Sequence, residues 1–143
     1  MFGVQPYINF NGNCREAIEF YKDALGGEIL YVQSYGDSPM KGMGPDDAVM
    51  HCTLKIGDSH IMACDNPEGQ SSGDSGKISL AIGSNDPSGA DAMFDKIADG
   101  GNVTMPMQET FWAARFGMVT DKFGVNWMFN CDKPESDHAE ATA

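Results

Sequence analysis

His51 is the residue of this sequence best suited to acid–base chemistry or to hydrogen bonding a ligand oxygen. An imidazole can act as a general base or as a hydrogen-bond donor. It lies in "VMHCTLKI", residues 49–56, where alternate residues are apolar, as in a half-buried strand. We predict His51 as a catalytic residue on the face opposite the apolar one. The alternative is a structural histidine held by a hydrogen bond.

A second candidate group combines aromatic side chains with one cation. Trp112, Phe116 and Trp127 could stack on a planar or apolar ligand, and Arg115 could pair with a ligand carboxylate or phosphate. We predict all four as ligand-binding residues. The alternative for the aromatic residues is a place in the core, and for Arg115 a solvated position on a strand.

Polar residues near the N-terminus complete the predicted site. Tyr7 and Asn9 alternate with Ile8 and Phe10, so they share one face of a strand and are predicted to bind ligand. Two other polar positions have simpler interpretations. Asp121 begins the turn "DKFG" and is expected to cap it. Cys64 would be a nucleophile only if a neighbour such as His60 lowered its pKa, and burial is the expected state.

Charge and composition exclude several classes of protein. The 143 residues carry a formal charge of −12, which repels phosphate backbones and anionic lipid surfaces, so nucleic acid is not an expected partner. The hydrophobic fraction of 41% is enough for a core. No stretch resembles a membrane span or a signal peptide, which predicts a cytoplasmic protein. The four cysteines have neither disulfide-framework nor zinc-finger spacing.

The elements that must position these residues form a repeat. "EFYKDALGGEI" (19–29) matches "MFDKIADGGNV" (93–103) at an offset of 74 residues, and each reads as a helix that ends at glycine before a strand. At an offset of 67, "IGDSHIMACD" (56–65) matches "FGVNWMFNCD" (123–132), which pairs Cys64 with Cys131. The chain therefore reads as a duplicated unit.

Each unit is predicted to have the order β-α-β-β-β. The helices are expected over 14–25, with Asn13 as N-cap, and over 87–99, with Pro87 in the first turn. The strands are expected over 5–10, 28–35, 49–57 and 59–64 in the first unit and over 77–83, 102–107, 114–121 and 125–130 in the second.

The predicted domain limits follow from composition. We expect one domain over 1–131, with module 1 at about 1–66, a Gly/Ser/Asp-rich linker at 67–76 and module 2 at about 77–131, followed by a flexible acidic tail over 132–143. The loop "GDSPMKGMGPDD" (36–47) interrupts the first module. It could cover a ligand or be a passive surface loop.

The order of these segments resembles a known family. "GNCREAIEFYKDALGGE", "MHCTLKIGDSHIMACD", "GGNVTMPM" and "TFWAARFGMVTDKFGVNW" are similar to the PhnB/YjdN-like branch of the glyoxalase/bleomycin resistance/dioxygenase (vicinal oxygen chelate) superfamily. The resemblance spans nearly residues 4–131. It implies an α+β fold in which two tandem βαβββ modules form a cup-shaped sheet around a cleft, in one chain or across a homodimer.

The resemblance also implies where a metal would be bound. Classical members hold a divalent metal through His and Glu on the first and last strands of each module. The matching positions are Pro6 or Tyr7, Leu80 or Ala81, Met128, and Ile61 by the repeat, or its neighbours His60 and Met62. The usual ligands are therefore absent, and no metal residue is predicted. A divalent metal held instead by His51, His60 or Asp65 stays open as an alternative.

Members of this branch also carry the label 3-demethylubiquinone-9 3-methyltransferase. The glycines of "DALGGEI" end a helix instead of opening one, so they do not form the Gly-rich cofactor-binding turn of an ordinary methyltransferase. We expect a protein that binds a small molecule in an apolar cleft without the usual metal. The alternatives are a metal-dependent lyase, isomerase or dioxygenase with altered ligands, and a protein that sequesters a cationic antibiotic.

Overall fold

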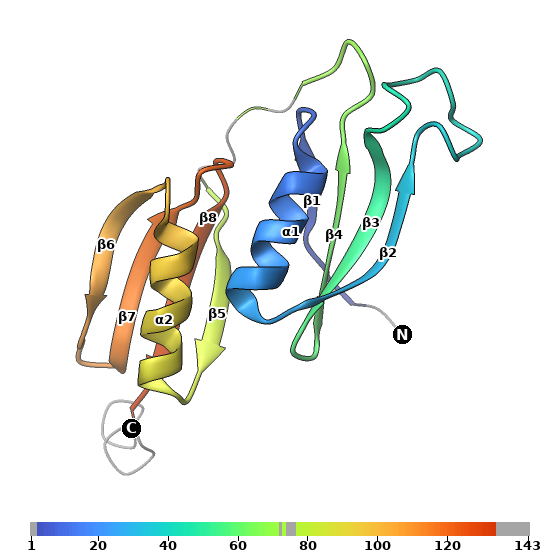
Figure 1. Cartoon of the computed structure of the whole chain (residues 1–143). Coiled ribbons are helices and arrows are strands. Elements are labelled where there is room, and N and C mark those ends of the chain that lie inside the picture. The colour runs from blue at the N-terminus through green and yellow to red at the C-terminus, as the bar shows by residue number, and fades with distance from the viewer. Residues whose placement is uncertain (1–2, 72, 74–76, 134–143) are drawn as a thin grey trace. The chain divides into compact units, whose positions relative to one another are not determined.

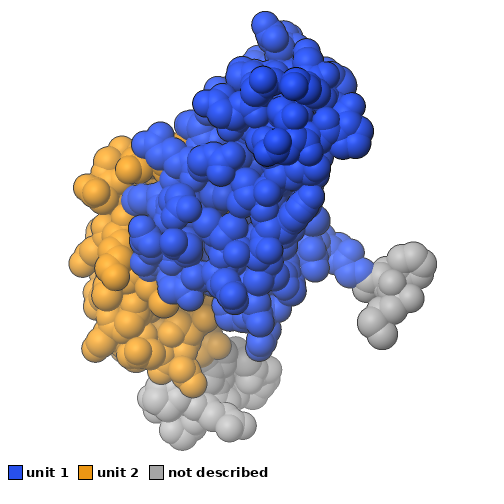
Figure 2. Space-filling model, turned by 45° about the vertical axis from the view of Figure 1, so that its right-hand side comes forward, with its two compact units in different colours: residues 1–73 blue, residues 74–143 orange. Residues whose placement is uncertain are grey.

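The computed structural model describes residues 3–71, 73 and 77–133, and its contacts divide the chain into two compact units. Unit 1 is Met1–Gly73 and unit 2 is Asp74–Ala143 (Figure 2). The division lies within the predicted linker, part of which, like most of the predicted tail, is outside the described residues. The predicted domain limits stay a prediction.

Unit 1 contains one helix against a four-stranded sheet (Figure 1). Its strands follow the order β1-β4-β3-β2, with β1 parallel to β4 and the other neighbours antiparallel. The elements are β1 (Tyr7–Phe10), α1 (Cys14–Leu25), β2 (Glu28–Ser34), β3 (Val49–Ile56) and β4 (Ser59–Asp65).

Unit 2 repeats this arrangement with the strand order β5-β8-β7-β6. Its elements are β5 (Leu80–Ser84), α2 (Pro87–Ala98), β6 (Asn102–Gln108), β7 (Ala113–Thr120) and β8 (Asn126–Asp132). The predicted α+β fold of two tandem βαβββ modules is thus confirmed. The first strand of unit 2 begins at Leu80 instead of Lys77, because its pairing with β8 starts where Leu80 lies beside Trp127. Within the described residues, no helix combines the length and apolarity needed to cross a membrane.

The paired glycines of the repeat have two distinct roles in each unit. Gly26 and Gly100, with φ of 67° and 75°, adopt the left-handed conformation in which a helix commonly ends. The second glycine of each pair lets two backbones approach closely. A Cβ on Gly27 would lie 2.8 Å from the carbonyl oxygen of Lys55, and one on Gly101 would collide with the carbonyl of Thr120.

The start of α1 is held by a side chain from β4 instead of its own N-cap residue. Asn13 occupies the N-cap position, as predicted, but its side chain makes no capping hydrogen bond. Asp65 Oδ1 accepts the backbone N–H groups of Gly12 and Cys14 at 3.0 and 2.9 Å, and its Oδ2 accepts that of Val49 at 2.9 Å. This buried carboxylate therefore joins α1 to β3 and β4.

Each helix covers one face of its sheet, and we call the other face the open face of that unit. In unit 1, Cys52 Sγ lies 3.7 Å from Cys14 Sγ of α1, which places Cys52 on the helix face and His51 on the open face. In unit 2, Phe129 packs edge-on against Phe94 of α2, with ring centroids 5.6 Å apart. Met128, the preceding residue of β8, therefore lies on the open face.

The predicted offset of 67 residues between β4 and β8 is wrong by one residue. Cys64 lies on the open face, where it bonds Asn9, whereas Cys131 alternates with Phe129 on the helix face. The turn between Thr120 and Asn126 is one residue longer than the corresponding turn between Lys55 and His60. A shift of one residue reverses the face of every strand side chain. Met62 therefore corresponds to Met128.

Candidate functional site

His51 lies between two tyrosines on the open face of unit 1. The hydroxyl of Tyr7, on β1, is 3.0 Å from His51 Nδ1, and the two ring centroids are 5.6 Å apart. The ring centroid of Tyr31, on β2, lies 6.1 Å from that of His51. Tyr7 and Tyr31 are 44% and 43% exposed. We call these residues the Tyr7–His51–Tyr31 cluster, and it offers a hydrogen-bonding imidazole flanked by aromatic surface.

Neighbouring polar groups hold this cluster in place. The Tyr31 hydroxyl donates to Gln33 Oε1 at 2.7 Å, and the Cys64 thiol donates to Asn9 Oδ1 at 3.1 Å. Asn9 thus lies on the same face as Tyr7, as predicted. Burial is the main cause that raises the pKa of Cys64, and its hydrogen-bond partners are Asn9 and Tyr7 instead of His60. This chemistry does not favour a thiolate nucleophile.

The open face of unit 2 carries a row of three aromatic rings. Trp112 makes edge contacts with Phe111 and Phe116, with centroids 4.8 and 5.3 Å apart, and its indole N–H donates to Asn130 Oδ1 at 3.2 Å. Phe111 is 79% exposed. We call Phe111, Trp112 and Phe116 the aromatic row. It presents a fixed apolar surface of the kind that planar ligands stack on.

Trp127 lies in the core of unit 2 and not on its open face. Its side chain is 1% exposed, and its indole N–H donates to Asp121 Oδ2 at 2.8 Å. Asp121 Oδ1 accepts the backbone N–H groups of Phe123 and Val125 at 2.8 and 3.0 Å. The predicted capping role of Asp121 is confirmed. Because Trp127 has almost no accessible surface, we leave it out of the proposed ligand surface.

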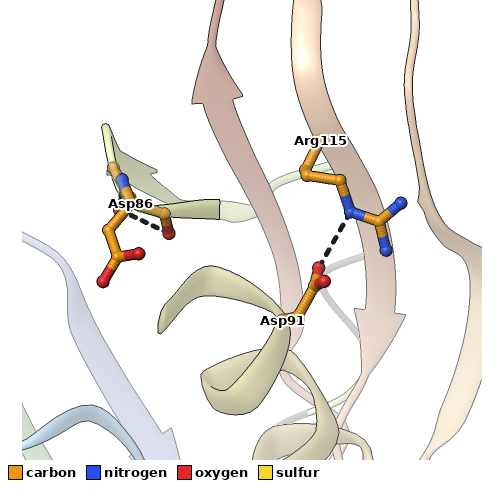
Figure 3. Close-up of polar contacts among 4 residues, drawn as sticks. Asp86, Asp91 and Arg115 are labelled. Carbon is orange, nitrogen blue, oxygen red and sulfur yellow. Dashed lines mark hydrogen bonds and ion pairs between the residues drawn. The ribbon is translucent and has the colours of Figure 1, made fainter. Parts of the chain in front are cut away.

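Arg115 faces the helix of unit 2, away from the aromatic row. Its Nε lies 3.0 Å from Asp91 Oδ1 of α2, in a half-exposed ion pair (Figure 3). Phe116, the next residue of β7, is on the open face. The same view shows Asp86 at the start of α2. The backbone N–H of Asp86 donates to the hydroxyl of Ser84 at 2.9 Å. The predicted ligand-binding residues of unit 2 thus do not share one face.

Sequence reasoning missed two aromatic residues of these surfaces, Tyr31 and Phe111. Both left a signal in the sequence. Phe111 directly precedes Trp112, and Tyr31 lies in a strand where its alternation with Val32 places it on one face. The pairing of Tyr31 with Thr53, two residues from His51, could not be read from the sequence because it depends on the register between β2 and β3.

A cavity of about 700 Å³ lies at the N-terminal end of α1, apart from the cluster. Its walls come from the start of α1, the end of loop 36–47 and residues 65–70. They include Asp65, one of the alternative metal ligands, but none of the predicted catalytic or ligand-binding residues. Tyr35 fixes this region by donating its hydroxyl to the backbone oxygen of Asp65 at 2.8 Å, and Glu68 N–H donates to the Met43 oxygen at 2.8 Å. Loop 36–47 is therefore tied to the body of unit 1.

The positions expected to hold a metal do not fit one. With the corrected register, the open-face residues at the first and last strands are Tyr7 and Met62 in unit 1 and Ala81 and Met128 in unit 2. Methionine is a soft ligand that the hard or borderline metals of such sites do not favour, and alanine has no donor. The part of the chain that the structure describes contains no group of three or more His, Cys, Asp or Glu arranged to hold a metal.

The alternative metal ligands are also separated. Asp65 is on the helix face with both carboxylate oxygens on backbone N–H groups, whereas His51 and His60 are on the open face. His60, on β4, pairs with Lys55 of β3. Lys55 is four residues along β3 from His51, a separation of about 13 Å at the rise per residue of a strand. These three residues do not form one coordination sphere.

The sequence and fold of the chain match those of a known superfamily. The family model described as the glyoxalase/bleomycin resistance protein/dioxygenase superfamily matches residues 5–129, and the chain belongs to this superfamily. Protein YjdN of Escherichia coli (strain K12) is 38% identical over 144 residues, covering 92% of this chain and 97% of YjdN. The chain is thus a homologue of YjdN.

Solved structures agree with this assignment. Protein PA1353 from Pseudomonas aeruginosa has a TM-score of 0.84 at 39% identity and covers 94% of this chain and 100% of its own. A PhnB protein from Bacillus cereus, described as a putative 3-demethylubiquinone-9 3-methyltransferase, has a TM-score of 0.75 at 23% identity and covers 91% and 99%. The second likeness shows the fold alone.

Proposed function

We propose that this protein binds a small molecule on an apolar and aromatic surface, without the divalent metal that classical members of its superfamily use. The observation that carries the proposal is which side chains occupy the open faces of the two units. Where metal-binding relatives are expected to carry His and Glu, this chain has Tyr7, Met62, Ala81 and Met128. The same faces offer the Tyr7–His51–Tyr31 cluster and the aromatic row.

The proposed role of His51 is to hydrogen-bond a polar atom of the ligand while the tyrosine rings contact its apolar part. On unit 2, Trp112 and Phe116 supply a separate apolar surface, held by the hydrogen bond between Trp112 and Asn130. Asn9 contributes a polar amide beside Tyr7. Arg115 is not part of this open-face surface, because its side chain pairs with Asp91 on the helix face.

Metal analysis tests the proposal directly. Protein purified without added metal is expected to contain less than stoichiometric zinc, nickel, manganese or iron by inductively coupled plasma mass spectrometry. A stoichiometric metal that disappears in His51→Ala but remains in His60→Ala would overturn the proposal in favour of a metal-dependent lyase, isomerase or dioxygenase. His60→Ala is the matched control because it removes a histidine of the same open face.

Ligand binding is tested by thermal shift with a panel of small neutral, anionic and cationic compounds. Binding to the folded state raises the melting temperature. We expect stabilisation by at least one neutral compound with a planar apolar part, reduced in His51→Ala for a compound bound to unit 1 and in Trp112→Ala for a compound bound to unit 2. Stabilisation by bleomycin-like cationic glycopeptides alone, kept in both variants, would instead favour antibiotic sequestration by the acidic surface.

We also propose that the protein is a homodimer, since the superfamily fold encloses its cleft either within one chain or across two. Light scattering coupled to size-exclusion chromatography measures this. A mass near twice the 15.4 kDa of the chain is expected. A monomer at all concentrations would reject the dimer while leaving the ligand-binding proposal intact.

A further inference from the structure

The contact with Tyr7 decides which nitrogen of His51 carries the proton. A neutral imidazole has one N–H donor and one bare nitrogen. The Tyr7 hydroxyl lies 3.0 Å from Nδ1, so two arrangements satisfy the distance. Either the Tyr7 O–H donates to Nδ1 and the imidazole proton is on Nε2, or Nδ1–H donates to the Tyr7 oxygen and Nε2 is bare.

The surroundings of Tyr7 favour the first arrangement. Burial, and next to it the nearby Cys64 together with a hydrogen bond to its side chain, raise the pKa of Tyr7, so its hydroxyl keeps its proton and can donate it to a neighbour. The nearby candidates are His51 Nδ1 and the Cys64 sulfur. Sulfur is a weak acceptor, whereas an imidazole nitrogen is a strong one. The Cys64 thiol itself donates a hydrogen bond to Asn9 Oδ1.

We propose that Tyr7 is a positioning residue that holds His51 with its proton on Nε2, so that the open face of unit 1 selects an uncharged ligand carbonyl as hydrogen-bond acceptor. This inference rests on the proposed function and specifies its ligand class. Tyr31 has a different role. Its hydroxyl donates a hydrogen bond to Gln33, so Tyr31 places an aromatic ring beside His51 without hydrogen bonding to it.

The choice of an uncharged acceptor follows from the groups around His51. Gln33 and Cys64, which hydrogen-bond to Tyr31 and Tyr7, carry no charge, nor does Asn9, the partner of Cys64, and the chain as a whole carries −12. Lys55, on the same face of β3, is four residues away, or about 13 Å along the strand. A carboxylate or phosphate would lose its water here without gaining a nearby cation, whereas a ketone or amide loses much less.

Nitrogen-15 NMR of histidine-labelled protein at about pH 8, where an ordinary imidazole is neutral, reads the tautomer directly. In the unmodified protein we expect His51 to be protonated on Nε2. In Tyr7→Phe we expect a mixture of tautomers, and in the control Tyr31→Phe, which removes the hydroxyl bonded to Gln33, no change. A proton on Nδ1 of the unmodified protein, or equal spectra of all three proteins, would overturn the inference.

The ligand class is tested on the same resonances with acetophenone and with ethylbenzene, which lacks the carbonyl oxygen. We expect acetophenone to shift the His51 Nε2–H signal at least threefold more than ethylbenzene at equal concentration, and this excess to shrink in Tyr7→Phe. Equal shifts, or none with acetophenone, would overturn the carbonyl selection. The proposed function is tested separately, by metal content and by thermal shift, so its failure is distinguishable from the failure of this inference. The unmodified protein gives its tautomer even if Tyr7→Phe does not fold.

Discussion

At the scale of residues, each unit has one buried carboxylate that accepts several hydrogen bonds. Asp65 is 2% exposed and Asp121 is 4% exposed, and every oxygen of both accepts an N–H group. They act at different places: Asp65 joins the start of α1 to β3, whereas Asp121 closes the turn before β8 and holds Trp127. Acidic residues with such contacts are structural, however suggestive a buried aspartate is of catalysis.

Replacing Asp121 by alanine is expected to lower the free energy of unfolding by about 3 kcal/mol, because it leaves the Trp127 indole and two backbone N–H groups without their acceptor. Urea unfolding followed by tryptophan fluorescence measures the loss. Asp58→Ala, an exposed aspartate in the β3–β4 turn, is the control and should change stability by less than about 0.5 kcal/mol. Equal losses in both variants would contradict the role given to Asp121.

At the scale of elements, the repeated glycine pair explains how a helix returns to its sheet. The first glycine adopts the left-handed conformation, as the C-cap of α1 at Gly26 and one residue beyond the C-cap Asp99 of α2 at Gly100. The second lets the chain pass against a neighbouring strand. Gly27 and Gly101 have ordinary backbone conformations but no room for a side chain, whereas Gly83 of β5 has open space around it. Gly27 and Gly83 are therefore a matched pair with opposite expectations.

Gly27→Ala is expected to destabilise the protein by about 1 to 3 kcal/mol, since its methyl group would lie against the Lys55 carbonyl and the strand would have to shift. Gly83→Ala should be neutral or slightly stabilising, because alanine restricts the unfolded chain without a clash. The midpoints of urea unfolding compare the two. A Gly27→Ala protein as stable as Gly83→Ala would show that close packing is not the reason for the glycine.

At the scale of the whole molecule, the free energy of unfolding is expected to decrease as the pH becomes alkaline. Burial raises the pKa of Cys64 from its ordinary 9.0 and that of Tyr35 from 10.0. The unfolded chain releases these protons first, so the folded state binds more protons than the unfolded state above about pH 9. The stabilisation is fully present below these ordinary values and is lost as pH rises through the folded-state values.

The free energy of unfolding in urea, with a reducing agent present, should therefore fall between about pH 8.5 and 10.5. Cys64→Ala removes one of the contributing groups, and its stability should fall less steeply over the same interval. A free energy that is constant or rises with pH, or an unchanged slope in Cys64→Ala, would contradict the assignment.

The sequence by itself determined the order of elements and the faces of most strands. Apolar periodicity, the glycine pairs and the repeat at an offset of 74 predicted both βαβββ modules. Alternation predicted that Tyr7 and Asn9 share one face of their strand and that His51 lies opposite the apolar face of its own strand. These signals are local, so one strand or helix contains all the information they need.

Only the tertiary structure decided what the side chains contact. It placed Arg115 against Asp91 on the helix face, buried Trp127 over Asp121, gave Asp65 the capping role expected of Asn13, and added Tyr31 and Phe111 to the candidate surfaces. It also shifted the match between β4 and β8 by one residue. Each of these depends on register between strands and on the length of a turn, which a single extra residue changes without altering the local pattern.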